Sequence, residues 1–273
     1  MSLLFSRPWT RQPQGPVRID WGNPLAAKLS AAALPTLSGI KLFSKQKYTD
    51  PLATPTGTAI TVKPAAGGIG AGIDGTLTSD TYKLSSLANQ TTSAWEEPSA
   101  TATWFVLCVR YGNNTNGNAS LFTNSDGRLA PYSAWHIADR SGAGTIRVEC
   151  SAGGINRGLD GPAFVNNKLT AICGRYDGAN LSVFTDGLKF GTSTACTGAL
   201  VYPSSANRGP AIGNFYAAPT SGRSFNGRIF VAVLFPVALS DAEIKSLSDN
   251  PWQLFAPIQR NLSLPSAGAY SIT

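Results

Sequence analysis

The stretch of sequence that decides the fold is FNGRIFVAVLFPVALSDAEIKSLSDNP, residues 225–251. Its segment 229–234 is apolar and rich in β-branched and aromatic residues, which predicts a buried strand. Ser240 offers a helix N-cap, and Glu243 follows at the spacing of a capping box. Asn250 precedes a proline and therefore avoids the α region, which ends the helix. The stretch predicts a last core strand followed directly by one short helix.

A second segment, residues 169–187, predicts a β-hairpin. Two alternating stretches, residues 169–176 and 181–185, are joined by Asp177-Gly178-Ala179-Asn180. An Asp-Gly pair is a strong hairpin signal, because glycine reaches positive φ without the steric cost of a Cβ atom. A second such pair, Asp186-Gly187, turns the chain again.

Together the two segments resemble the laminin-G-like, concanavalin A-like jelly roll. That family carries a hairpin of the pattern YDG…L.vy.DG and an ending of the pattern f.G.i..v.ify.aLsdaEi..l…P. The matching positions here are Tyr176, Asp177, Gly178, Leu181, Asp186, Gly187, Phe225, Gly227, Ile229, Leu239, Ser240, Glu243, Ile244 and Pro251. The resemblance implies an all-β jelly-roll sandwich with one short C-terminal helix and extended N- and C-terminal segments. It says little about function, because one fold hosts many activities.

The chain of 273 residues is long enough for one large all-β domain with extensions. We expect an extended basic N-terminal arm at residues 1–47, the jelly roll at 48–251 and a C-terminal tail at 252–273. Within the jelly roll, further strands are expected at residues 101–111, 121–123, 134–139, 145–150 and 211–215. Residues 25–34 are rich in Ala and Leu and predict a short helix that Pro35 stops.

The charge of the chain is concentrated near its start. The net charge is +7, and residues 1–47 hold seven basic residues and one acidic one. Prolines in the first 24 residues favour an extended conformation. We therefore expect an arm that docks on an acidic protein surface. Its binding residues would be Arg7, Trp9, Arg11, Arg18 and Trp21. A solvated tail is the alternative, and nucleic acid fits less well because the arm does not interleave basic and aromatic residues.

The four cysteines, Cys108, Cys150, Cys173 and Cys196, have no CxxC spacing. With His136 as the single histidine, they do not form a zinc motif. Cys108 and Cys173 fall inside apolar strands, where free cysteine behaves as a small buried hydrophobe. The sequence favours reduced, buried thiols and leaves a Cys173–Cys196 bridge open.

Catalytic patterns are weak. A retaining glycosidase on this fold needs two carboxylates on one strand face, as in ExDxE, and that pattern is absent. Glu96 and Glu97 are adjacent, so in a strand they point to opposite faces. Glu149 is isolated in sequence and is expected at the surface, and His136 is expected to be structural, since no GxSxG motif accompanies it. We therefore expect a protein that is not an enzyme.

No cofactor is expected. Asp-Gly turns can bind calcium through carboxylate and carbonyl oxygens, and some laminin-G-like domains do so. The candidates for such a site are Asp126, Asp160, Asp177 and Asp186, although each is first a turn former.

Glycan binding is the most plausible small-ligand role, because sugars stack on aromatic rings and hydrogen-bond to polar side chains. The candidate glycan-binding residues are Tyr132, Trp135, Tyr202 and Tyr216. Phe215 is a further aromatic candidate, and Asn113, Asn114, Asn116 and Asn207 are polar residues of a suitable type nearby.

The ends of the chain suggest an origin. The stretches IDWGNPL (residues 19–25) and NPWQLF (residues 250–255) around such a jelly roll resemble bacteriophage and prophage virion proteins. The start of the chain lacks a signal-peptide pattern, and no segment is apolar enough to span a membrane. We expect a homo-oligomeric structural protein of the virion, a capsid decoration or minor capsid component whose partners are major capsid or tail proteins. The alternative is a tail or fibre adhesin that binds host glycans.

Overall fold

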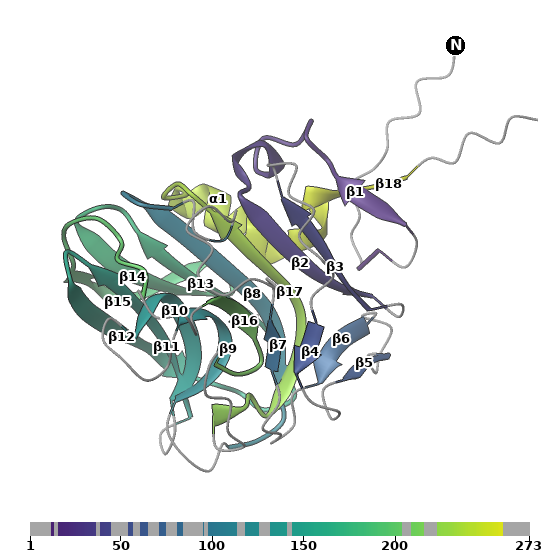
Figure 1. The fold of residues 1–273 in the computed structure, drawn as a ribbon, viewed down its shortest axis with the longest axis horizontal. Helices are drawn as coiled ribbons and strands as arrows, with labels where there is room; N and C mark the ends of the chain where they lie inside the picture. The colour runs from purple at the N-terminus through teal and green to yellow at the C-terminus, as the bar shows by residue number, and fades with distance from the viewer. Residues whose placement is uncertain are drawn as a thin grey trace, which may run out of the picture.

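The computed structural model describes residues 12–13, 16–36, 39–44, 54–56, 61–64, 71–74, 81–83, 95, 98–113, 118–125, 132–140, 144–203, 209–215 and 223–258. In these residues two antiparallel sheets pack face to face (Figure 1). The expected all-β sandwich with one short C-terminal helix is confirmed. None of the helices in the described part of the chain is long and apolar enough to cross a membrane.

The first sheet, called here the front sheet, has the strand order β12-β11-β10-β9-β16-β7-β4. Its strands are β12 (Ile155–Ala163), β11 (Thr145–Ala152), β10 (Ser133–Arg140), β9 (Asn118–Ser125), β16 (Gly209–Ile212), β7 (Thr81–Lys83) and β4 (Thr54–Thr56).

The second sheet, called the back sheet, has the order β15-β14-β13-β8-β17-β2-β3, and β6 joins it by pairing with both β17 and β5. Its strands are β15 (Leu188–Ala195), β14 (Asn180–Thr185), β13 (Leu169–Tyr176), β8 (Ala102–Arg110), β17 (Gly227–Phe235), β2 (Ala31–Thr36), β3 (Gly39–Ser44), β6 (Ala71–Asp74) and β5 (Thr61–Pro64).

Strand β8 shows why the chain builds two separate cores. Trp104 and Val106 belong to the inner core between the two sheets, whereas Phe105 and Leu107 belong to an outer core on the opposite face of the back sheet. Because side chains alternate along a strand, a continuous apolar run such as that of β8 needs cover on both faces. The sequence 229–234 in β17 has the same character and lies in the middle of the back sheet.

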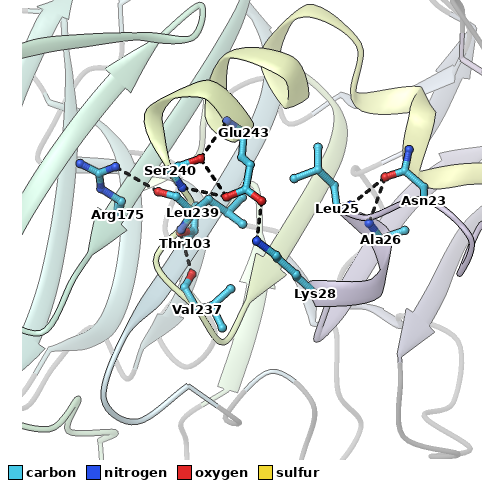
Figure 2. Close-up of polar contacts among 10 residues, drawn as sticks. All are labelled: Asn23, Leu25, Ala26, Lys28, Thr103, Arg175, Val237, Leu239, Ser240 and Glu243. Atoms are coloured by element: carbon cyan, nitrogen blue, oxygen red, sulfur yellow. Dashed lines mark hydrogen bonds and ion pairs between the residues drawn. The ribbon is translucent and has the colours of Figure 1, made fainter.

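The outer core is covered by the helix α1 (Asp241–Asp249) and by the N-terminal segment. Ser240 and Glu243 form the expected capping box, and Lys28 of the N-terminal segment pairs with the Glu243 carboxylate at 2.5 Å (Figure 2). Leu239, just before the helix, donates its N–H to the Thr103 hydroxyl of β8 at 2.9 Å. These contacts place the helix against the back sheet.

The helix expected at residues 25–34 is wrong. Only Ala26–Lys28 forms a turn of 3-10 helix, and Ala31–Thr36 is the strand β2. The Asn23 side chain caps the short turn by accepting hydrogen bonds from Leu25 and Ala26 (Figure 2). The run of alanines then packs on both faces of the back sheet, where small side chains fit close to β17. Tertiary packing overrides the helix propensity of alanine here.

The division expected between residues 47 and 48 is not visible in the strand pairing, since β2 and β3 belong to the back sheet. Further towards the N-terminus, β1 (Val17–Ile19) pairs with β18 (Phe255–Pro257), so both ends of the described chain meet at one end of the molecule (Figure 1). Val17 and Ile19 are buried in the outer core. In its described residues 16–36 and 39–44, the segment expected to be an arm is part of the folded domain.

The cysteines are free and buried, as expected. A Cys173–Cys196 bridge does not fit the fold, because Cys173 lies in the outer core and Cys196 in the inner core. The thiol of Cys196 instead lies beside that of Cys150.

Candidate functional site

A pocket of about 220 Å³ opens on the front sheet, on the face that points away from the inner core. Its residues come from four neighbouring strands and from the segments that follow β16 and precede β17. The lining consists of Asn118, Tyr132, Ser133, Glu149, Asn156, Phe215 and Arg223. This set combines aromatic rings, amides and charged groups in one depression.

Glu149 is held by two neighbours and is not an isolated surface residue, which corrects the expectation from the sequence. Its Oε1 accepts a hydrogen bond from Arg147 Nε at 2.5 Å, and its Oε2 lies 3.1 Å from His136 Nδ1. His136 and Glu149 are direct partners across β10 and β11, and Arg147 lies on the same face two residues along β11. The register of the sheet therefore assembles the trio.

The Glu149 carboxyl stays ionised. Burial opposes ionisation, but the hydrogen bonds and positive charges of His136 and Arg147 outweigh it and lower the pKa of Glu149 to about 2. An ionised carboxylate only accepts hydrogen bonds, so Nδ1 of His136 carries the hydrogen between them. Each carboxylate oxygen has a second lone pair, which leaves Glu149 able to accept hydrogen bonds from a ligand in the pocket.

Gly158 makes room for this arrangement. It lies directly opposite Glu149 on β12, and a Cβ atom there would overlap the guanidinium of Arg147. Arg147 crosses β12 at this point and also donates to Asp160 Oδ1 at 2.7 Å. The glycine thus allows one arginine to bridge two carboxylates.

His136, which contacts the pocket residues Glu149 and Phe215, is hydrogen-bonded through its backbone to the back sheet. Trp104 of β8 donates its indole N–H to the backbone carbonyl of His136 at 3.1 Å across the inner core. Trp104 in turn lies over Gly174 of β13, where any side chain would overlap the indole. The position of His136 therefore depends on packing between the two sheets.

Phe215 supplies the aromatic wall. The centre of its ring lies 5.2 Å from the centre of the His136 imidazole. The Arg223 guanidinium also contacts this ring, with its carbon 5.1 Å from the ring centre. Tyr132 is 46% exposed at the pocket margin, and it and Phe215 are the aromatic glycan-binding candidates from the sequence that lie among the described lining residues. Phe215 and Tyr132 offer apolar ring surface, and Asn118 and Asn156 offer amide donors and acceptors.

Two other candidate glycan-binding residues are placed elsewhere. Trp135 is fully buried in the inner core, with its ring 4.5 Å from that of Phe122, so it cannot present a face to a sugar. The sequence places it in a strand but does not tell which face it occupies. Tyr202 packs against the inner core and donates its hydroxyl hydrogen to the Pro98 carbonyl at 2.6 Å. Tyr216 lies outside the described residues.

Of the four asparagines named with these aromatic residues, the structure describes only Asn113. Asn113 accepts a hydrogen bond from Arg110 at 2.8 Å. Asn114, Asn116 and Asn207 lie outside the described residues, as does Glu96.

Of the expected arm residues, Arg7, Trp9 and Arg11 lie outside the described residues. Arg18 is exposed on β1 between buried Val17 and Ile19, and Trp21 is 45% exposed just after it. The described part of the arm therefore presents a cation and an aromatic ring to solvent, while its alternate side chains anchor it.

The candidate calcium ligands are engaged separately. Asp160 pairs with Arg147 and Arg140, and Asp186 pairs with Lys168 at 2.7 Å. Asp177 accepts the backbone N–H groups of Ala179 and Asn180 in the expected hairpin turn. Asp126 lies outside the described residues. Among the residues that the structure describes, no three His, Cys, Asp or Glu side chains lie together as a metal cluster.

The laminin G profile of the concanavalin A-like lectin/glucanases superfamily matches residues 71–245. No curated protein sequence matches the chain. Among solved structures, the binding domain of Paraclostridial Mosquitocidal Protein 1 superposes with a TM-score of 0.58 at 14% identity, covering 82% of this chain and 52% of that one. Domain 4 of AbnA, an extracellular arabinanase from Geobacillus stearothermophilus solved with arabinotriose, gives 0.54 at 16% identity, covering 81% of this chain and 98% of that domain.

The sialidase of Trypanosoma rangeli in complex with sialic acid gives a TM-score of 0.53 at 14% identity. The match covers 81% of this chain but only 33% of the sialidase. At these identities the likeness concerns the fold, and the function has to be argued from the pocket.

Proposed function

The chain belongs to the concanavalin A-like lectin/glucanase superfamily, and from this membership we propose that it is a glycan-binding module whose binding site is the pocket on the front sheet. The observation that carries the proposal is the meeting of the Phe215 ring with the ionised Glu149 carboxylate in that pocket. The apolar face of a pyranose or furanose ring packs on the aromatic ring, and its hydroxyl groups donate to the carboxylate and to the amides of Asn118 and Asn156.

The pocket is large enough for a single sugar ring but not for a whole oligosaccharide. At about 220 Å³ it accommodates one terminal or internal residue, and the exposed ring of Tyr132 at the margin offers a contact for the next one. The arabinanase domain that shares the fold was solved with a trisaccharide, which supports an oligosaccharide as the ligand class. The proposed site needs no metal or other cofactor.

The same residues support binding without catalysis. A glycosidase needs a carboxylic acid whose pKa is raised so that it can protonate the leaving oxygen. The pKa of Glu149 is shifted in the opposite direction, and its two oxygens are already engaged by Arg147 and His136. We therefore propose that Glu149 orients a sugar and does not transfer protons to it.

A glycan array probed with the full chain tests this proposal, followed by calorimetric titration with the oligosaccharide that binds best. We expect saturable binding that weakens at least about tenfold in Phe215→Ala, the effect of losing about 1.4 kcal/mol of ring contact. Asn156→Ala, which removes one amide from the pocket, should weaken it as well. Phe190→Ala is the matched control, because Phe190 is an exposed aromatic residue on β15 outside the pocket.

Absence of saturable binding on the array would contradict the proposal, as would equal affinity of the Phe215→Ala, Asn156→Ala and Phe190→Ala proteins. Hydrolysis of the bound oligosaccharide by the wild type, lost in Glu149→Gln, would show an enzyme instead of a binding module.

We propose, second, that the protein is located in a bacteriophage or prophage virion. There it would be a capsid decoration or minor capsid protein, or else a tail or fibre adhesin. The supporting observation is that exposed Arg18 and Trp21 lie by β1, whereas the pocket strand β12 lies at the opposite end of the molecule in Figure 1. One end can thus attach to a major capsid or tail protein, in oligomeric form, while the other remains open.

The double variant Arg18→Glu, Trp21→Ala tests this location, since it leaves the buried residues of β1 in place. We expect its occupancy on purified particles to fall while its glycan binding is unchanged. Unchanged occupancy, or absence of the wild-type protein from particles, would contradict the second proposal alone.

A further inference from the structure

Two cysteine thiols meet at the end of the sandwich where β12 and β15 lie. Cys150 is on β11 of the front sheet, and Cys196 directly follows β15, the edge strand of the back sheet. Their Sγ atoms lie 3.4 Å apart, although 46 residues separate them in sequence. Cys108 and Cys173 are completely buried elsewhere. Cys173 lies in the outer core, where its thiol donates a hydrogen bond to the Gly174 carbonyl.

The backbone around the pair is already fixed. Gly153 donates its N–H to the Ala199 carbonyl at 2.9 Å, and Val201 donates to Ser151 at 2.8 Å. These bonds tie the turn of β11–β12 to the segment after Cys196. The two sulfurs can therefore approach by side-chain movement, without a change in the fold.

Cys196 is the less buried member of the pair, 3% exposed against 0% for Cys150. It lines a second pocket, of about 130 Å³, together with Arg157 and Thr197. The hydrogen bond from Cys150, the charge of Arg157 and the N–H of Ala152 lower the pKa of the Cys196 thiol against the opposing effect of burial. Cys150 keeps its proton, because that same hydrogen bond and burial raise its pKa. Burial raises the pKa of Cys108 and Cys173, which makes them unreactive.

We propose that Cys150 and Cys196 are a reversible redox pair that closes into a disulfide between the two sheets when the protein meets a low-molecular-weight disulfide. In the first step the Cys196 thiolate attacks one sulfur of the small disulfide and displaces its other half as a thiolate. In the second step Cys150 gives its proton to that thiolate and attacks the Cys196 sulfur of the mixed disulfide. The second half of the small disulfide leaves as a thiolate and takes up, from water, the proton that Cys196 lost when it ionised. The protein loses two hydrogen atoms in total, and the small disulfide is reduced to two thiols.

The disulfide would stabilise the folded sandwich. It closes a loop of 46 residues that includes β12, β13, β14 and β15, and such a cross-link restricts the unfolded chain. The inference concerns neither the glycan pocket nor the proposed location, because neither thiol lines the pocket on the front sheet.

Oxidation of the full chain with oxidised glutathione, followed by alkylation in denaturant and peptide mass mapping, tests the proposal. We expect the wild type to lose two alkylatable thiols, to yield a Cys150–Cys196 cross-linked peptide, and to recover both thiols with dithiothreitol. The Cys108→Ser, Cys173→Ser protein should behave in the same way, because it retains the pair. Cys150→Ser should stop at the mixed disulfide on Cys196.

The thermal midpoint gives a second readout. Oxidation should raise it by roughly 5–10 °C in the wild type and leave it unchanged in Cys196→Ser. Retention of four alkylatable thiols in oxidised wild type, a cross-link to Cys108 or Cys173, or a stable mixed disulfide in the presence of Cys150 would each overturn the proposal. The peptide mass map of the oxidised wild type tests the proposal even if a serine variant fails to fold.

Discussion

The Nδ1 atom of His136 lies 3.1 Å from Oε2 of Glu149, although the two residues are 13 positions apart in sequence. They meet because β10 and β11 pair in a register that sets them directly opposite each other. Since side chains alternate between the faces of a sheet, a slip of one strand by one residue would send its member of the pair to the other face. The charge arrangement of the pocket is therefore a property of the sheet register.

Gly158→Ala tests whether the glycine is needed to seat Arg147. The added Cβ atom would overlap the guanidinium, so Arg147 must leave the Glu149 carboxylate. We expect a loss of about 1–3 kcal/mol in the free energy of unfolding, measured by denaturant titration, because a largely buried carboxylate loses a charged partner. In an Arg147→Ala background the same substitution should cost much less, and equal costs in both backgrounds would show that the glycine serves another purpose.

Acid should destabilise the protein through Glu149. Its pKa is about 2 in the folded protein against an ordinary value of 4.5, so it contributes stability that is fully present above pH 4.5 and is lost as the pH falls towards 2. His136, Arg147 and, through Arg147, Asp160 are the titratable groups that contact it.

Comparison of the wild type with Glu149→Gln isolates this contribution. The difference in unfolding free energy should shrink by about 3 kcal/mol between pH 5 and pH 2. A difference that stays constant over this range would mean that the Glu149 pKa is not lowered.

Ile19→Ala should destabilise the whole domain. Ile19 lies in the outer core on β1, so its truncation removes buried apolar surface and leaves a cavity. The expected loss is about 2–5 kcal/mol in the free energy of unfolding. Arg18→Ala is the matched control on the adjacent, exposed position and should change stability by less than about 0.5 kcal/mol. If both variants were equally stable, the segment would be a tether and not part of the core.

Ser240→Ala removes the N-cap of α1. The Ser240 hydroxyl accepts the Glu243 N–H at 3.3 Å, and the Glu243 carboxylate accepts the Ser240 N–H at 2.9 Å. We expect a loss of about 1 kcal/mol in unfolding free energy, which Ser240→Thr should largely avoid because threonine can also cap. An equal loss in Ser240→Thr would place the effect in packing and not in the cap.

Local patterns were enough to predict the elements that depend on neighbouring residues. The Ser240–Glu243 cap and the Asp177-Gly178 turn need only residues a few positions apart, and both are present. The edge strands β12 and β15 were missed, because INRGLDGPA and LKFGTSTA lack the apolar alternation of strands that face a core. β15 is exposed along most of its length and β12 is exposed or only partly buried at all positions but one, so little selects for apolar side chains there.

The pocket could be predicted only in part for a related reason. Tyr132 was identified by its residue type and its place beside a loop, but Trp135, of equally suitable type, faces the core. The partnership of Glu149 with His136 and Arg147 depends on the register between β10 and β11, and the periodicity of either strand alone does not reveal which residues lie opposite each other. Likewise, the burial of Val17 and Ile19 depends on β18 at the far end of the chain.

The most direct test of the glycan pocket is a map of where the ligand binds. Amide chemical shifts of the isotope-labelled full chain would be followed by NMR during titration with the best oligosaccharide from the array. We predict saturable shifts centred on Glu149, Asn156 and Phe215, and none on the exposed edge strand β15 around Phe190. Saturable shifts that spare the pocket and cluster on another face would contradict the account.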